Sequence, residues 1–186
     1  MIVSNASPSE QSSPFYEVNK KFCLTFEEFI QKNKGVCEGK YNAWSYLIVG
    51  KINTPKEWVL KYKKSTLTSG NLLLSSKTQN LFVSSVWKTH GLENEKFIIR
   101  KKKPKDSLFK IFNSKFKALE NLKKYILISK NKSKSISDLT TILRPLLISG
   151  EVYHISNNNK ELVIELRTDK HYFDIFKKLN DRNIID

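Results

Sequence analysis

The segment from Tyr125 to Leu179 constrains the fold most, because its apolar residues follow the order strand, helix, strand, turn, strand, helix. Ser135 offers a capping hydroxyl, and Asp138 supplies a carboxylate three residues later. Apolar residues then recur at the spacing of one helical face, at Leu139, Ile142, Leu143, Leu146 and Leu147. A stripe of this kind predicts a helix that is buried on one side.

Two short β-prone runs follow this helix, at 151–155 and 162–166. Residues 156–160 separate them and contain three asparagines, which tolerate left-handed turn conformations. The pattern predicts a β-hairpin. Thr168 or Asp169 is expected to cap a last helix whose core face holds Tyr172, Phe173, Phe176 and Leu179.

The N-terminal third combines a polar leader with a second helix. Residues 1–14 are rich in Ser and other polar residues and predict a disordered leader, whereas 15–22 are expected to form a short strand or an arm. Thr25 and Glu28 have the spacing of a capping box, so a helix is expected to start there and to end before Gly35. Its buried side would hold Phe26, Phe29 and Ile30.

The segment between Gly39 and Arg100 has the pattern of β-strands. The β-prone runs lie at 41–52, 57–66, 81–87 and 96–100. Turn-like breaks separate them at 53–55, 69–71 and 89–91. Short connections favour pairing between neighbours, so we expect an antiparallel meander. Trp44, Trp58 and Trp87 would share a core face, or one of them would line a ligand groove.

Together these elements predict an α+β fold, with an antiparallel, meander-like sheet packed against three to four helices. A chain of 186 residues is long enough for one core, and we expect a single domain from residue 15 to 186. No apolar run is long enough to span a membrane, and no secretory signal is visible, which predicts a soluble, cytoplasmic protein. Cys23 and Cys37 are then expected to be reduced, partly buried thiols.

The formal net charge of +15 is concentrated between Arg100 and Lys134, where thirteen Lys or Arg accompany only Asp106 and Glu120. An amphipathic helix is expected at 107–116 within this basic segment. Its lysines are candidates for binding the phosphates of a nucleic acid. They are Lys101, Lys102, Lys103, Lys105, Lys110, Lys115, Lys117, Lys123, Lys124, Lys130, Lys132 and Lys134.

Two interpretations of this lysine excess stay open. A polyanion, either nucleic acid or an anionic surface, would bind it with steep salt dependence. Phe109, Phe112 and Tyr125 could stack bases, although aromatic residues at helical spacing more often belong to the core. Alternatively, the lysines are a solvated surface that reflects compositional bias, and a protein partner becomes the better hypothesis. Lysine outnumbers arginine, the better bidentate reader of phosphate and guanine. The sequence thus favours a non-catalytic binding or assembly module and leaves the oligomeric state open.

The C-terminal half also resembles a bacterial family of unknown function. The similarity rests on hydrophobic spacing in the Leu-rich helix and in the segments 97–100, 108–112, 125–129 and 162–165. In that family a soluble α+β domain usually follows membrane helices, which this chain does not show. The resemblance implies a domain shape and no catalytic residues.

A metal-dependent nuclease is the alternative function. Glu151, Glu161, Glu165 and Lys170 lie in or beside the C-terminal hairpin, where carboxylates could hold a metal and a water. The spacing does not complete a metal cluster, so no metal ligand and no catalytic residue is predicted. His90, His154 and His171 are scattered, and the six glycines form no phosphate-binding loop. No cofactor is expected.

Overall fold

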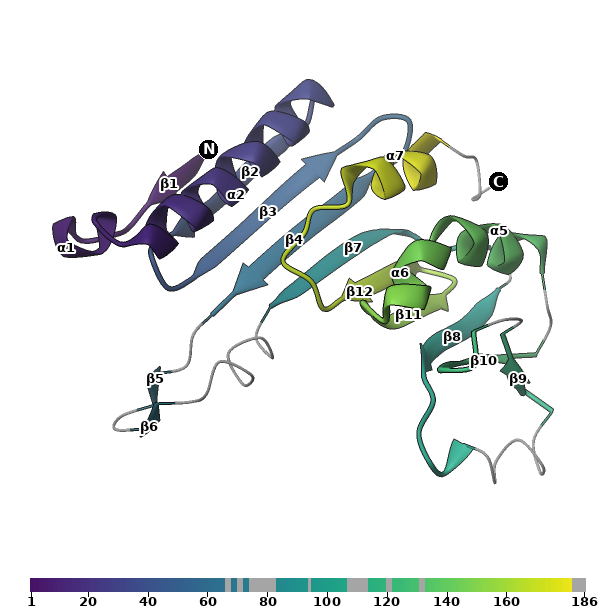
Figure 1. Ribbon diagram of the computed structural model, residues 1–186. Coiled ribbons are helices and arrows are strands. Elements are labelled where there is room, and N and C mark those ends of the chain that lie inside the picture. Colours follow the sequence, from purple (N-terminus) through teal and green to yellow (C-terminus); the bar gives the residue numbers. More distant parts are fainter. Residues whose placement is uncertain are drawn as a thin grey trace. The chain divides into compact units, whose positions relative to one another are not determined.

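The computed structural model describes residues 1–65, 68–69, 72–73, 83–93, 95–106, 114–119, 122–130 and 133–181. The chain forms two compact units (Figure 1). Unit 1 contains Met1–Trp87 and Arg167–His171, and unit 2 contains Lys88–Leu166 and Tyr172–Asp186. The expected single domain therefore consists of two units, each of which combines β-strands with helices.

The main sheet of unit 1 has the strand order β1-β2-β3-β4. The first pair is parallel, and the others form an antiparallel meander, as predicted. Their bounds are β1 Ile2–Ser4, β2 Val36–Tyr41, β3 Tyr46–Ile52 and β4 Trp58–Lys64. A separate two-stranded ladder pairs β5 Thr68–Ser69 with β6 Leu72–Leu73.

The expected strand at 41–52 is interrupted by a turn. The side-chain oxygen of Asn42 accepts hydrogen bonds from the backbone N–H groups of Trp44 and Ser45, at 2.9 and 2.8 Å. This Asx-type turn satisfies the backbone locally, so the run divides into the end of β2 and all of β3. Because the run 41–52 is rich in aromatic residues, the sequence pattern predicted one continuous strand and missed the turn.

The N-terminal segment is helical where a leader and a strand were predicted. Residues 2–4 form β1, and α1 spans Pro8–Gln11 with a capping box between Ser7 and Glu10. Helix α2 spans Pro14–Lys32 and begins at the N-cap Ser13, so 15–22 is its first half rather than a strand or an arm. The Ser13-Pro14 pair is itself a start signal, and the Thr25 capping box falls inside the helix.

Helix α2 packs on one face of the unit 1 sheet. Phe26, Phe29 and Ile30 are buried, as predicted. Gly50 of β3 permits a close approach, because a Cβ atom there would lie 2.6 Å from Ile30 and 2.7 Å from Phe26. The left-handed residue after α2 is Lys34, with φ 56°, rather than Gly35.

The tryptophans and cysteines of unit 1 divide between core and surface. Trp58 and Trp87 are buried, whereas Trp44 is 49% exposed, so the expected three-tryptophan core holds two. Cys23 is buried and Cys37 half-buried, and both are free thiols, as predicted. Burial raises the pKa of Cys23 to about 12, which keeps its thiol protonated and unreactive.

Unit 2 contains an entirely antiparallel arrangement with the strand order β12-β11-β8-β10-β9. The bounds are β8 Lys96–Lys101, β9 Phe116–Ala118, β10 Tyr125–Ser129, β11 Val152–Asn158 and β12 Glu161–Leu166. Strand β7, Ser84–His90, contains the boundary between the units. The expected turn at 89–91 therefore begins only after His90.

The predicted hairpin is confirmed as β11 and β12, with a tighter turn than expected. Asn159 adopts the left-handed conformation, with φ 70°. Asn157 lies within β11 and is buried; its side chain exchanges hydrogen bonds of 2.9 and 3.0 Å with the backbone of Leu92. Strand β11 extends to Asn158, beyond the predicted end at residue 155, because the Asn157 amide is hydrogen-bonded to the loop that precedes β8.

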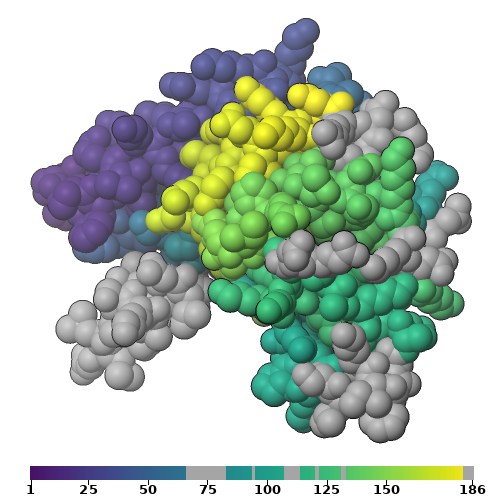
Figure 2. All heavy atoms as spheres, turned by 45° about the vertical axis from the view of Figure 1, so that its right-hand side comes forward, coloured from purple at the N-terminus to yellow at the C-terminus, as the bar shows by residue number. Residues whose placement is uncertain are grey.

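Two helices of unit 2, α5 Lys134–Ile142 and α6 Arg144–Ser149, lie over one face of its sheet (Figure 1). Helix α7 spans Phe173–Asp181. The predicted stripe is confirmed as buried, although the single expected helix divides at Leu143, just before Pro145. Figure 2 shows α5 and α6 in green beside the yellow C-terminal segment, and α5 contacts α7.

The caps of these helices differ from the predictions. Ser133, not Ser135, caps α5 by accepting from the backbone N–H of Ile136. Helix α7 begins at Phe173, while the Thr168 hydroxyl accepts from the N–H of Lys170 and so does not cap it. Phe176 and Leu179 are buried as expected, but Tyr172 and Phe173 are half-buried. Most of the helix expected at 107–116 lies outside the described residues.

We expect Leu143→Ala to lower the free energy of unfolding by about 2 to 5 kcal/mol, because Leu143 is fully buried and the substitution leaves a cavity. Urea denaturation measures the change. Ile148→Ala, at a residue 59% exposed in the same helical region, is the control and should change stability by less than about 0.5 kcal/mol. A loss below about 1 kcal/mol for Leu143→Ala would contradict the packing.

Candidate nucleic-acid interface

The pairing of β8 with β10 gathers half of the candidate lysines at one end of these strands. Lys101 lies opposite Tyr125 in the register, and the backbone N–H of Lys102 donates to the carbonyl of Lys124 at 2.8 Å. The lysine cluster formed in this way consists of Lys101, Lys102, Lys103, Lys105, Lys123 and Lys124, all of which are exposed. Within the described residues, no carboxylate forms an ion pair with these ammonium groups.

Asp106, an acid that contacts the backbone of the lysine cluster, is used by the fold. Its two carboxylate oxygens accept hydrogen bonds of 2.7 and 2.8 Å from the guanidinium of Arg100. It also accepts from the backbone N–H of Lys103 at 2.6 Å, and its side chain is 3% exposed. Because a buried carboxylate paired in this way is already neutralised, the lysine cluster keeps its positive charge.

Of the remaining described candidates, Lys115 and Lys130 lie at the other end of β10, and Lys117, opposite Leu127, extends its side chain toward that end. The backbone N–H of Ser129 donates to the carbonyl of Lys115 at 3.0 Å, and the ammonium of Lys117 donates to the carbonyl of Lys130 at 2.9 Å. Lys134 begins α5. A strand of five residues separates the two groups by roughly 13 Å. The structure therefore divides the basic segment in two, and Lys110 and Lys132 lie outside the described residues.

An aromatic residue that shares a surface hollow with part of the lysine cluster is Phe116, which the sequence pattern did not indicate. Phe116 is half-buried on the edge strand β9 and lines a surface hollow together with Arg100, Lys103, Pro104, Lys105 and Asp106. Tyr125, in contrast, is buried, and its hydroxyl donates to the carbonyl of Val152 at 2.8 Å. Burial raises the pKa of Tyr125 to about 12. Tyr125 thus belongs to the core, and Phe109 and Phe112 lie outside the described residues.

The open face of the unit 2 sheet continues from Phe116. Register places one half-exposed row across its five strands, formed by Phe116, Ile128, Ile98, Ser156 and Val163. The next row holds Ala118, Ile126, Arg100, His154 and Glu165, and Ile126 in this row is buried. Because side chains alternate between faces, these residues point away from the buried Ile99 and Leu127. The lysine cluster therefore borders a mixed apolar and polar surface.

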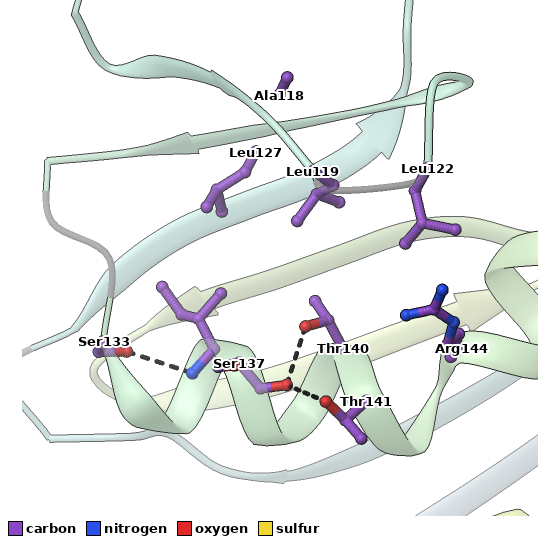
Figure 3. Close-up of a pocket in the computed structure, with 10 residues that line it drawn as sticks. Ala118, Leu119, Leu122, Leu127, Ser133, Ser137, Thr140, Thr141 and Arg144 are labelled. Atoms are coloured by element: carbon purple, nitrogen blue, oxygen red, sulfur yellow. Dashed lines mark hydrogen bonds between the residues drawn. The ribbon is translucent and has the colours of Figure 1, made fainter.

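A pocket of about 260 Å³ lies on the other face, between α5 and the strands β9 and β10 (Figure 3). Leu119, Leu122 and Leu127 point toward the helix and form its apolar wall. The hydroxyls of Thr140 and Thr141 donate to the carbonyl of Ser137 at 2.9 and 2.8 Å. These two hydroxyls therefore donate within the helix, and Ser133, Ser137 and Arg144 are further polar residues that line the pocket.

The carboxylates proposed for a nuclease are held by other contacts. Glu161 pairs with Lys88, and Glu151 accepts hydrogen bonds of 2.6 Å from the hydroxyls of Ser149 and Tyr172. Glu165 lies opposite His154, and Lys170 is exposed in unit 1. Among the described residues, no group of three or more His, Cys, Asp or Glu side chains could hold a metal ion.

His171 has a structural environment within unit 1. Its ring stacks on Phe22 with 3.8 Å between centroids, and its Nε2 lies 3.0 Å from the Phe22 carbonyl. Burial lowers the pKa of His171 to about 4, so the ring is neutral at pH 7 and donates from Nε2 to that carbonyl. His90 is exposed at the end of β7, and His154 is half-buried in β11.

No protein-family model matches the sequence, and the search of curated proteins found no similar one. None of the helices in the described ranges has both the length and the apolar character needed to cross a membrane. The resemblance of the C-terminal half to a bacterial family accordingly stays a prediction.

Hydrogen bonds from Arg100 and from the Lys103 backbone lower the pKa of Asp106 to about 2, against the opposing effect of burial. The folded pKa lies below the unfolded value, so this carboxylate stabilises the fold above about pH 4 and its contribution is lost toward about pH 2. We expect Asp106→Asn to cost about 1 to 3 kcal/mol at neutral pH. Urea denaturation at neutral and acid pH measures both effects.

The matched control is Asp181→Asn, at an exposed position of α7. It should change stability by less than about 0.5 kcal/mol at either pH. Equal pH dependence in wild type and Asp106→Asn would mean that the Arg100 pair does not stabilise the fold.

Proposed function

We propose that unit 2 is a non-catalytic nucleic-acid-binding module whose lysine cluster contacts backbone phosphates. The observation that carries this proposal is the concentration of six exposed lysines at one end of β8 and β10, where the described acid Asp106 is bound to Arg100. Ammonium groups that lack a local counter-charge gain most from displacing the counterions of a polyanion. Contact with phosphates is insensitive to base sequence.

Phe116 favours nucleic acid over an anionic membrane surface as the polyanion. Phe116 lines the same hollow as Lys103 and Lys105, so a base that stacks on its ring would place the adjacent phosphates near those lysines. A lipid headgroup layer has no planar ring to use this contact. Single-stranded RNA or DNA, whose bases are accessible, is therefore the proposed ligand class. Binding would take place in the cytoplasm, the location that the sequence predicts.

The nuclease alternative receives less support from the described carboxylates. Glu161 and Glu151 have cationic or hydroxyl partners, and Glu165 faces His154 across a strand pair without a further acid beside them. Lysines that neutralise phosphates need no metal to do so. The proposal is accordingly binding without cleavage.

Fluorescence anisotropy with a labelled single-stranded RNA of mixed sequence tests the proposal. If four lysines contact phosphates, the slope of log K against log salt is about −3, and affinity falls roughly fiftyfold between about 50 and 200 mM salt. Lys103→Ala combined with Lys124→Ala should reduce that slope by about one and a half. Lys160→Ala with Lys178→Ala removes the same charge from exposed positions elsewhere in unit 2 and should leave the slope nearly unchanged.

Phe116→Ala separates stacking from charge. It should weaken RNA binding by about 1 to 3 kcal/mol while the salt slope stays as in the wild type. RNA binding that is absent at low salt would contradict the proposal, and so would equal slopes in the two double variants. Binding to phosphatidylserine vesicles alone would identify an anionic surface instead. RNA cleavage with magnesium that disappears in Glu165→Ala would establish the nuclease.

A further inference from the structure

A second charged surface lies in unit 1, on the sheet face opposite α2. Ile48 and Gly50 of β3 face the helix, so Leu47, Val49 and Lys51 point the other way. Leu47 is 46% exposed and Val49 is half-buried. The register extends this surface, here named the β2–β4 face, to Val36, Glu38, Lys40, Leu47, Val49, Lys51, Val59, Lys61 and Lys63.

Charged residues flank the apolar residues of the central strand. Leu47 lies opposite Lys40 of β2 and Lys63 of β4. Val49 lies opposite Glu38 and Lys61 in the same way. All four charged side chains are exposed, and within the described residues none of them forms an ion pair. Lys51 follows between Val36 and Val59 and ends the apolar strip.

The dimensions of this strip match one α-helix. Neighbouring strands lie about 4.8 Å apart, so the backbones of Lys40 and Lys63 are separated by about 10 Å, the diameter of a helix. Leu47 and Val49 are about 6.7 Å apart along β3, close to the ~6 Å rise between helix positions i and i+4. Lysine side chains are longer than leucine or valine, so they stand on both sides of a lower apolar floor.

We propose that the β2–β4 face docks a short, acidic, amphipathic α-helix of a protein partner. Leu47 and Val49 contact the apolar stripe of that helix, while Lys61 and Lys63 pair with carboxylates along one flank. On the other flank Lys40 selects a carboxylate and Glu38 selects a cation. This unequal pattern sets the direction in which the helix lies. The proposal concerns unit 1 and does not rest on nucleic-acid binding by unit 2.

Other occupants fit this face less well. None of its nine residues is aromatic, so it offers no platform for stacking bases. A second copy of the same face would bring lysines against lysines, which is repulsive. A flat lipid surface would meet the lysine ammonium groups first and leave Leu47 and Val49 out of contact.

The test uses a fluorescein-labelled synthetic peptide of about 15 residues, long enough to form a helix, with a leucine stripe flanked by glutamates. Its control has the same composition with the leucines scrambled around the helix. Anisotropy titrations of the full chain are expected to show binding of the first peptide and at least tenfold weaker binding of the second. Amide exchange should show protection of β3 and β4 on binding, with α2 unchanged.

Charge-reversed variants locate the contact. Lys61→Glu with Lys63→Glu should weaken binding of the acidic peptide at least tenfold. Lys21→Glu with Lys32→Glu makes the same change of net charge at exposed positions of α2 and should alter it less than threefold. Leu47→Asp, at an exposed position, should weaken it at least tenfold, while circular dichroism and thermal unfolding verify that each variant folds.

Several results would overturn the proposal. Equal binding of the scrambled peptide would mean that only net charge is recognised. Equal effects of the two lysine double variants would place the contact elsewhere. No binding of the acidic peptide at about 1 mM, the weakest affinity expected of a specific contact, would exclude a helix-docking face. If Lys61 and Lys63 instead bind RNA or phosphatidylserine vesicles, the Lys61→Glu, Lys63→Glu variant loses binding to RNA or vesicles, and the acidic peptide does not compete with them.

Discussion

The burial of the apolar stripe of α5 and α6 on one sheet face determines what unit 2 can present to a partner. Leu139, Leu143 and Leu147 are at most 1% exposed, and they cover the face that also holds Ile99 and Leu127. Once that face is closed, successive residues of β8 alternate between buried and partly exposed positions, whereas Tyr125, Ile126 and Leu127 of β10 are all buried. The basic residues lie mainly at strand ends and in turns; Lys101 and Lys117 share the face of Ile99 and Leu127, but they stand at the end of β8 and on the edge strand β9.

The Arg100–Asp106 pair then sets the charge of that surface. A carboxylate that accepts three hydrogen bonds in a buried position is bound to its arginine and cannot neutralise its lysine neighbours. The same hydrogen bonds hold the turn that follows β8, from which Lys103 and Lys105 extend. One arginine serves the fold, and the more flexible lysines stay available for a polyanion. Charge and chain geometry in this region therefore have one physical origin.

In unit 1 too, a helix covers one face of the sheet and leaves the other face to a partner, but the charges are arranged differently. A single helix, α2, covers one face of its sheet through a close contact at Gly50, and the opposite face alternates apolar residues with lysines. The charges of this face stand in rows beside an apolar strip, whereas those of the lysine cluster gather at strand ends. The two surfaces are therefore suited to different partners, an amphipathic helix in unit 1 and a phosphate backbone in unit 2.

The sequence by itself determined the elements whose apolar residues keep a regular period. The stripe from Leu139 to Leu147, the β11–β12 hairpin and the β2–β4 meander could all be predicted, because period and turn chemistry are local properties. Local signals also competed: the capping box at Thr25 obscured the true helix start at Ser13. Burial of Tyr16 and Asn19 against the sheet gives the longer helix its stabilising contacts, and no local pattern contains that contribution.

Only the tertiary structure decided which charges act together. Strand β8 pairs with β10 and β11, neither of which is its neighbour in the chain order, and this pairing brings Lys102 beside Lys124 while moving Lys130 to the far end. Register likewise aligns Lys40, Leu47 and Lys63 across three strands of unit 1. The sequence shows the number of lysines in a segment, but hydrogen bonding between strands far apart in the chain determines where their charges lie in the folded protein. Phe116 was not predicted for the same reason, since strand pairing brings it into the hollow that Lys103 and Lys105 also line.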